Sequence, residues 1–117
     1  ARLELVITGA VEPLHKEIEA TLLRITEEAL GNATKHADAT RVAVTLSYLG
    51  DEVAVDVRDD GRGFDLLSRP AHSTSGGFGL DGMRQRAARV AGAVEIETEP
   101  SGGTAVSARV PLVRDVE

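Results

Sequence analysis

The chain of 117 residues contains no cysteine and no tryptophan, and only 3% of its residues are aromatic. Without cysteine it forms neither disulfide bonds nor thiolate metal sites, and aliphatic side chains and alanine must fill its core. Hydrophobic residues make up 42% and charged residues 27% of the chain, an ordinary composition for a soluble globular protein. The length indicates one domain, residues 1–117, with one core.

Basic residues are fewer than acidic ones, and the formal net charge is −6. Because duplex nucleic acids are bound by basic faces, we expect no nucleic acid partner. The sequence has no apolar run long enough to span a membrane and no signal peptide, so we expect a cytoplasmic location and leave open a membrane anchor in a longer parent chain. An acidic chain can still bind a polyphosphate where magnesium and a few local cations offset the charge.

Hydrophobic periodicity predicts two helices, over residues 14 to about 37 and over residues 79–90. The strands between and after them come in adjacent runs, which is typical of hairpins. We therefore expect an α+β fold, a two-layer sandwich with a mixed or antiparallel sheet and both helices packed on one face. Alternating apolar residues predict strands over residues 2–8, 41–48, 53–58, 94–98 and 106–110.

The segment between the fourth predicted element and the second helix has few apolar residues and is rich in glycine, serine and aspartate. It is too long to be a simple turn. Long loops in compact domains are usually functional or disordered. We expect residues of about 65–78 to fold over a ligand as a lid.

Three side chains share one face of the first predicted helix, since each residue turns the helix by about 100°: Glu28, Asn32 and Lys35. Glu28 lies at the margin of the stripe expected to be buried, so we expect it to be partly buried. A partly buried carboxylate beside an amide can orient a water molecule or accept a proton, and the amide oxygen can ligate a hard cation. The alternative for this motif alone is a solvated face of Glu–Lys pairs.

An acidic turn with two glycines follows the third predicted strand, with the sequence Asp59-Asp60-Gly61-Arg62-Gly63. The carboxylate of Asp59 would lie at the strand end and could accept a hydrogen bond from an exocyclic amine, and the glycines let a ring approach the backbone. The alternative is an ordinary acidic turn.

A glycine-rich stretch, Gly76-Gly77-Phe78-Gly79-Leu80, leads into the second predicted helix. Backbone amides at a helix N-terminus bind phosphate well, although glycines also close plain loops. The Gly-Lys-Ser/Thr sequence of the Walker-type phosphate loop is absent, and the three histidines do not have the spacing of metal ligands.

These three stretches, in this order and together with Gly102-Gly103-Thr104, resemble the nucleotide-binding motifs of the GHKL ATPase superfamily. The closer resemblance is to the catalytic ATP-binding domain of two-component sensor histidine kinases related to the nitrate/nitrite and fatty-acid-desaturase sensors. It spans essentially the whole chain. It implies the Bergerat sandwich fold, ATP and Mg²⁺ as cofactors, and transfer of the γ-phosphate of ATP to a histidine on a separate dimerisation domain.

The resemblance implies roles for individual residues. Asn32 is expected to ligate magnesium, Glu28 to polarise the nucleophile for phosphoryl transfer, and Asp59 to bind the adenine amine. The other cofactor-binding positions are expected to contact phosphates, shape the adenine pocket or support the base through water: Lys35, His36, Gly61, Gly63, Gly77, Gly79, Leu80 and Thr104.

The phosphoacceptor motif of the family, a His-Asp pair preceded by arginines and glutamates, has no counterpart here, and His15 does not match it. We therefore expect a catalytic domain that binds ATP, is a monomer in isolation and does not phosphorylate itself. Its expected partners are the phosphotransfer domain of the same kinase and, indirectly, a response regulator. The alternatives are an anti-sigma-factor-type serine kinase, a degenerate nucleotide-binding interaction module and a plain structural domain.

Overall fold

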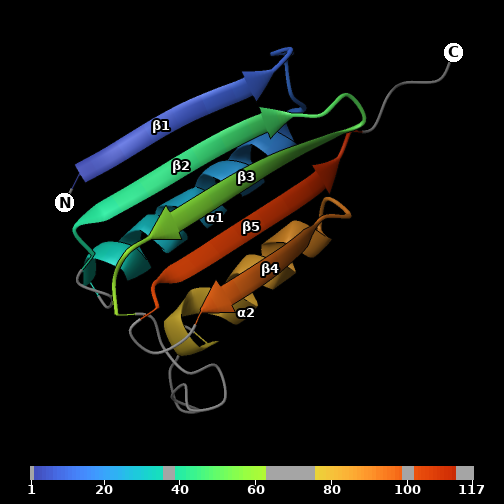
Figure 1. The fold of residues 1–117 in the computed structure, drawn as a ribbon. Helices are drawn as coiled ribbons and strands as arrows, with labels where there is room; N and C mark the ends of the chain where they lie inside the picture. The colour runs from blue at the N-terminus through green and yellow to red at the C-terminus, as the bar shows by residue number, and fades with distance from the viewer. Residues whose placement is uncertain (1, 36–38, 63–75, 99–101, 113–117) are drawn as a thin grey trace, which may run out of the picture.

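The structure is a computed structural model that describes residues 2–35, 39–62, 76–98 and 102–112. For residues 76–79 it describes the backbone alone. The described residues form five strands and two helices, arranged as in Figure 1. In chain order they are β1 (Arg2–Gly9), α1 (Lys16–Lys35), β2 (Arg41–Tyr48), β3 (Glu52–Asp59), α2 (Gly76–Ala88), β4 (Ala93–Thr98) and β5 (Thr104–Pro111).

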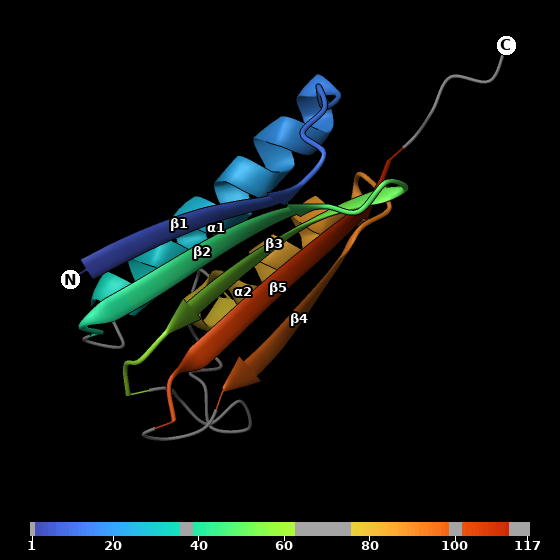
Figure 2. The same cartoon turned by 45° about the horizontal axis from the view of Figure 1, so that its top comes forward.

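The strands form one sheet with the order β1-β2-β3-β5-β4. β1 is parallel to β2, and the other three pairings are antiparallel. Both helices lie on the same face of this sheet (Figures 1 and 2). The prediction of an α+β two-layer sandwich with a mixed sheet and helices on one face is confirmed.

The core lies between the helices and the sheet. α1 buries residues at three- and four-residue steps, which is the apolar stripe of an amphipathic helix. Toward the helices, β3 buries Val53, Val55 and Val57, and β5 buries Val106, Ala108 and Val110. As the composition predicted, the fully buried side chains are aliphatic or methionine, the largest being Ile25, Leu80, Met83, Val53 and Val110.

The second helix differs from its prediction at both ends. It begins at Gly76, three residues before the predicted start, because the tertiary packing of Leu80 and Met83 outweighs the low helix propensity of the glycines. It ends at Ala88, and the following turn puts Ala91 at a φ of 59°. The Gly92 N–H then donates to the Ala87 carbonyl at 2.8 Å, which closes the helix end.

Every residue of β1 is exposed, and the helices pack mainly on the other strands. α1 contacts β3 and β5, and α2 contacts β4 and β5. The apolar side of β1 that faces the helical layer is therefore exposed, with Leu3, Leu5 and Ile7 at 59%, 65% and 53%. Within the described residues, neither helix has both the length and the apolar character needed to cross a membrane.

Candidate functional site

The sequence motifs meet at one end of the sandwich. α1 ends just before β2, whose second residue, Val42, lies opposite Asp59 at the end of β3. Asp59 lies opposite Thr104, and Thr104 lies opposite Thr98 at the end of β4. Because β4 runs back along α2 after the turn at Gly92, the N-terminus of α2 lies at this same end (Figure 1).

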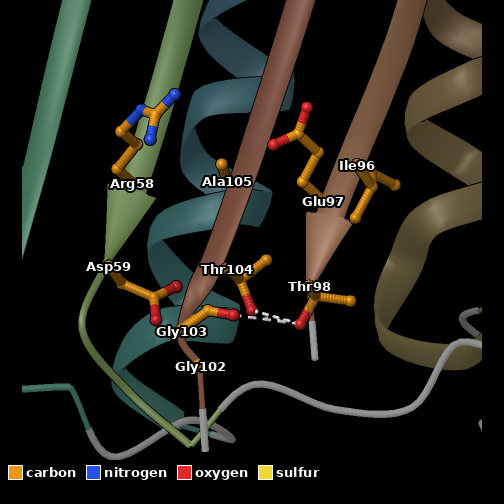
Figure 3. Close-up of a pocket in the computed structure, with 9 residues that line it drawn as sticks. All are labelled: Arg58, Asp59, Ile96, Glu97, Thr98, Gly102, Gly103, Thr104 and Ala105. Carbon is orange, nitrogen blue, oxygen red and sulfur yellow. Dashed lines mark hydrogen bonds between the residues drawn. The ribbon is translucent and has the colours of Figure 1, made fainter. Parts of the chain in front are cut away.

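A row of polar side chains crosses this end of the sheet on its helix-facing side. Asp59, Thr104 and Thr98 continue the same strand faces that carry buried valines in the core, since side chains alternate along a strand. The Thr98 hydroxyl donates to the Gly103 carbonyl at 3.2 Å and lies 2.9 Å from the Thr104 hydroxyl (Figure 3). Thr98 was not among the predicted site residues. The signal that would have found it is a polar residue at an apolar position where a strand ends.

These residues line a hollow of about 490 Å³ at the strand ends. By strand alternation, Asp59 and Thr104 lie on the helix-facing side and Arg58, Glu97 and Ala105 on the opposite side. The hollow is therefore lined by residues of both faces of the sheet, at the ends of β3, β5 and β4 (Figure 3). It opens the end of the sheet to a ligand without opening the core.

The carboxylate of Asp59 is partly buried and held in one direction. Its Oδ1 accepts the Gly61 N–H at 2.9 Å, and its other oxygen has no hydrogen-bond partner among the residues that the structure describes. That second oxygen can accept a donor from a ligand. Gly103 is buried and has a φ of 76°, and a Cβ at this position would overlap the Asp59 carbonyl oxygen. Glycine is therefore required for β5 to begin this close to Asp59.

The neighbouring carboxylate, Asp60, ties this turn to the start of β2. Its Oδ1 accepts the N–H groups of Thr40 and Arg41 at 2.8 and 2.9 Å, and its Oδ2 accepts the Thr40 hydroxyl at 2.6 Å. The Thr40 hydroxyl bond, followed by the Arg41 amide bond, lowers the pKa of Asp60 from 3.8 to about 2. The hydrogen bonds of Asp60 to Thr40 and Arg41, here called the clamp, were not predicted from the sequence. Its signal is a threonine directly before a strand and a second aspartate in the turn that pairs with it.

α1 contributes the remaining described side chains of the predicted site. Asn32 is partly buried, and Lys35 is exposed in the last turn. Glu28 is exposed, so the expectation that it is partly buried was wrong. The physical reason is that α1 buries only a narrow stripe centred on Ala29, with Ile25 at its edge, and Glu28 lies about 100° from that centre.

The other predicted positions lie in or near parts that the structure does not describe. His36 and Gly63 fall outside the described residues, as does most of the predicted lid. Gly77 and Gly79 lie in the first turn of α2, where the backbone N–H groups have no partner within the helix itself. Leu80 is 1% exposed and packs in the core, so its contact with a cofactor stays a prediction.

The chain was compared with known proteins. The family model described as "Histidine kinase-, DNA gyrase B-, and HSP90-like ATPase" matches residues 17–114. The chain belongs to this ATPase family. It is 33% identical over 92% of its length to the signal transduction histidine-protein kinase/phosphatase DegS of Brevibacillus brevis, and 34% identical over 86% of its length to the sensor protein VraS of Staphylococcus haemolyticus.

The structural comparison agrees on the fold. The ATPase chain superposes on ShkA, solved at full length in complex with AMPPNP, with a TM-score of 0.77 over 99% of this chain and 26% of that one, at 23% identity. The chain spans only 27% and 28% of the lengths of the DegS and VraS relatives. The predicted resemblance to an ATP-binding catalytic domain of two-component histidine kinases is confirmed.

Proposed function

We propose that this ATPase domain binds Mg-ATP at the end of the sandwich and donates the γ-phosphate to a histidine on a separate dimerisation domain. The observation that carries the proposal is the convergence of the three motifs: Asp59 and Thr104 face each other across β3 and β5, with the end of α1 and the start of α2 beside them. Membership of the ATPase family and kinship with two histidine kinases support the same function.

The base of the nucleotide fits the polar row. One oxygen of Asp59 is engaged by Gly61 and the other is available to an exocyclic amine, which would distinguish adenine from guanine, whose corresponding position carries a carbonyl. If the Thr98 hydroxyl donates to the Gly103 carbonyl, the Thr104 hydroxyl donates to Thr98. The Thr104 oxygen can then accept a hydrogen bond from a water molecule beside the base. Gly61 and Gly63 would shape the wall against which the ring lies.

The phosphates fit the helix ends. Gly77 and Gly79, in the first turn of α2, offer backbone N–H groups at the positive end of the helix dipole. Lys35 would add positive charge from the end of α1, and His36 would be a further phosphate contact. Among the described residues, no three His, Asp or Glu side chains gather as a metal site. Asn32 offers one amide oxygen, which suits a magnesium ion that keeps water and phosphate oxygens as its other ligands. The ion would offset the phosphate charge.

The transfer itself needs a nucleophile brought next to Glu28. An exposed carboxylate one helical turn before Asn32 can accept a proton or a hydrogen bond from an incoming imidazole. The rest of the chemistry is positioning and charge neutralisation of the phosphoryl group. Because the acceptor histidine is supplied by another domain, the isolated chain is expected to bind ATP without phosphorylating itself.

The test is calorimetric titration of ATP into the domain, with and without Mg²⁺. We expect Asp59→Asn to weaken ATP binding at least tenfold, because an amide presents a donor to the adenine amine. Asp56→Asn is the matched control, since Asp56 lies on the same strand but on the opposite face, and it should bind like the wild type. Equal affinity of wild type and Asp59→Asn would refute the proposed adenine site.

The transfer step is tested separately. Glu28→Gln should keep ATP affinity within about twofold and lose most of the phosphotransfer to an added acceptor domain. The reason is that the Glu28 carboxylate acts on the nucleophile, whereas the other site residues bind the nucleotide. Glu27→Gln, on the solvent side of the same turn, is its control. Transfer to serine in place of histidine would favour the serine-kinase alternative, and binding without any transfer would favour the interaction module.

A further inference from the structure

A groove of about 370 Å³ runs between α1 and α2, away from the strand ends that carry Asp59. Its lining combines an uncharged floor with three arginines. Ala20 and Thr21 of α1 and Val90 after α2 form the floor, and they are the uncharged residues among the described ones that line the groove. The charged lining residues are Arg24 from α1, Arg86 from α2, Arg89 just after it, and one acidic residue, Glu17.

The guanidinium groups of the three arginines in this groove form no ion pair or hydrogen bond that would stabilise the described part of the fold. All three are exposed, and within the described part of the chain none of their guanidinium groups has an ion-pair or hydrogen-bond partner. Glu17 lies in the same groove without forming an ion pair there with any described arginine. Three unpaired cations against one acid give the groove a positive charge in a chain whose net charge is −6.

The chemistry of the groove selects a carboxylate-bearing ligand. A guanidinium group presents a planar fork of donors that matches a carboxylate with two parallel hydrogen bonds. Cations from two helices facing one groove can engage acids spaced along an extended or helical segment. The uncharged floor can accommodate the aliphatic stems of such a segment, which a small inorganic anion lacks.

The position of the groove relates it to the phosphoryl transfer. Arg24 precedes Glu28 by four residues on α1, which is one helical turn, or about 6 Å along the axis. A polypeptide that brings its histidine to Glu28 can therefore reach the arginine groove with a neighbouring segment. We propose that this arginine groove binds an acidic segment of the polypeptide that receives the phosphoryl group.

The inference rests on the proposed function, and it adds the docking surface for the acceptor. Such a contact would raise the association rate and set the orientation of the acceptor more than its affinity, because exposed charge pairs are individually weak. It would also make the encounter sensitive to ionic strength, since the Debye length falls to about 8 Å at physiological salt. Nucleotide binding at the polar row, which lies away from this groove, does not depend on it.

The direct test uses fluorescently labelled helical peptides whose glutamates are spaced by one or two helical turns, and matched peptides with glutamine in place of glutamate. Binding to the whole chain is followed by anisotropy at low and physiological salt. We expect the acidic peptides to bind, the glutamine peptides not to bind, and the Arg24→Ala/Arg86→Ala double variant to bind the acidic peptides about tenfold more weakly. Arg84→Ala is the control, because Arg84 is an exposed arginine of α2 outside the groove.

Three results would overturn the inference. They are equal binding of the acidic and glutamine peptides, equal affinity of the double variant and the Arg84→Ala control, and arginine-dependent binding of tripolyphosphate or single-stranded RNA with no binding of the acidic peptides. ATP calorimetry on the same proteins separates this failure from that of the proposed function. The double variant should bind ATP normally, whereas only a normal affinity of Asp59→Asn would refute the nucleotide site.

Discussion

Replacing Gly103 by alanine should weaken both the fold and the nucleotide site, because two separate costs meet at this residue. Gly103 has a φ of 76°, and a Cβ added to it would overlap the carbonyl oxygen of Asp59. That oxygen belongs to backbone, which cannot move aside as a flexible side chain can. The start of β5 must therefore shift away from the end of β3, and it carries Thr104 with it.

The size of the effect follows from these two costs. A left-handed backbone conformation costs an alanine about 1–2 kcal/mol, and overpacking a close contact costs about 1–3 kcal/mol. The sum, about 2–5 kcal/mol, is a large fraction of the total stability of about 6–17 kcal/mol expected for a domain of this length. Because the shift moves Thr104 away from Asp59, ATP affinity should fall along with stability.

Gly50→Ala is the matched control. Gly50, in the turn between β2 and β3, has a φ of 88°, but a Cβ there would meet nothing within 4 Å. It should lose about 1–2 kcal/mol and keep normal ATP binding. The assay is urea unfolding at 25 °C for each variant, followed by ATP calorimetry under conditions where the variant is folded. If Gly103→Ala loses no more stability than Gly50→Ala, the close packing of β5 against Asp59 is refuted.

Two further predictions concern the clamp at Asp60 and the interior of α1. The pKa of Asp60 in the folded state is lowered from 3.8 to about 2. Its contribution to stability is therefore present above pH 4 and is lost as the pH falls from 4 to 2. Asp60→Asn should lose less stability than the wild type over this pH range, and an unchanged pH profile of stability would refute the clamp. Gly31 lies inside α1, where a Cβ would meet nothing within 4 Å. Gly31→Ala should therefore raise the free energy of unfolding by about 0.5–1 kcal/mol, measured as a higher urea midpoint, and a lower midpoint would contradict this.

The fold could be predicted from the sequence wherever apolar periodicity is strong. The β2 and β3 hairpin and α1 lie within two residues of their predicted bounds, because their valines and leucines repeat at the strand and helix periods. The start of α2 could not be predicted, since glycines carry no pattern and a loop is their local preference. The parallel pairing of β1 with β2 is set by tertiary geometry, so alternation alone left the sheet as mixed or antiparallel.

The candidate site was predictable to the extent that each motif carries a local signal. Asp59 and Thr104 were named from their motifs, and the structure brings them opposite each other. Thr98 was missed because its role depends on pairing with Thr104 across strands. Asp60 was missed because its role depends on a contact to Thr40, which lies 20 residues away. The exposure of Glu28 was also mispredicted, because the stripe that α1 buries is centred on Ala29, with Ile25 only at the edge that is nearer to Glu28.

The arrangement of this end of the sheet explains why a core and a site can share the same strands. On the helix-facing side, β3 carries Val53, Val55 and Val57 before Asp59, and β5 carries Thr104 before its buried residues. The apolar rows fix the register, because a slip by one residue would turn every valine to the other face. The polar row at the strand ends is fixed in the same register, because it lies on the same strands. Asp59 and Thr104 are therefore held opposite each other by the packing of the core behind them, which gives the site the rigid support that precise recognition of a base requires.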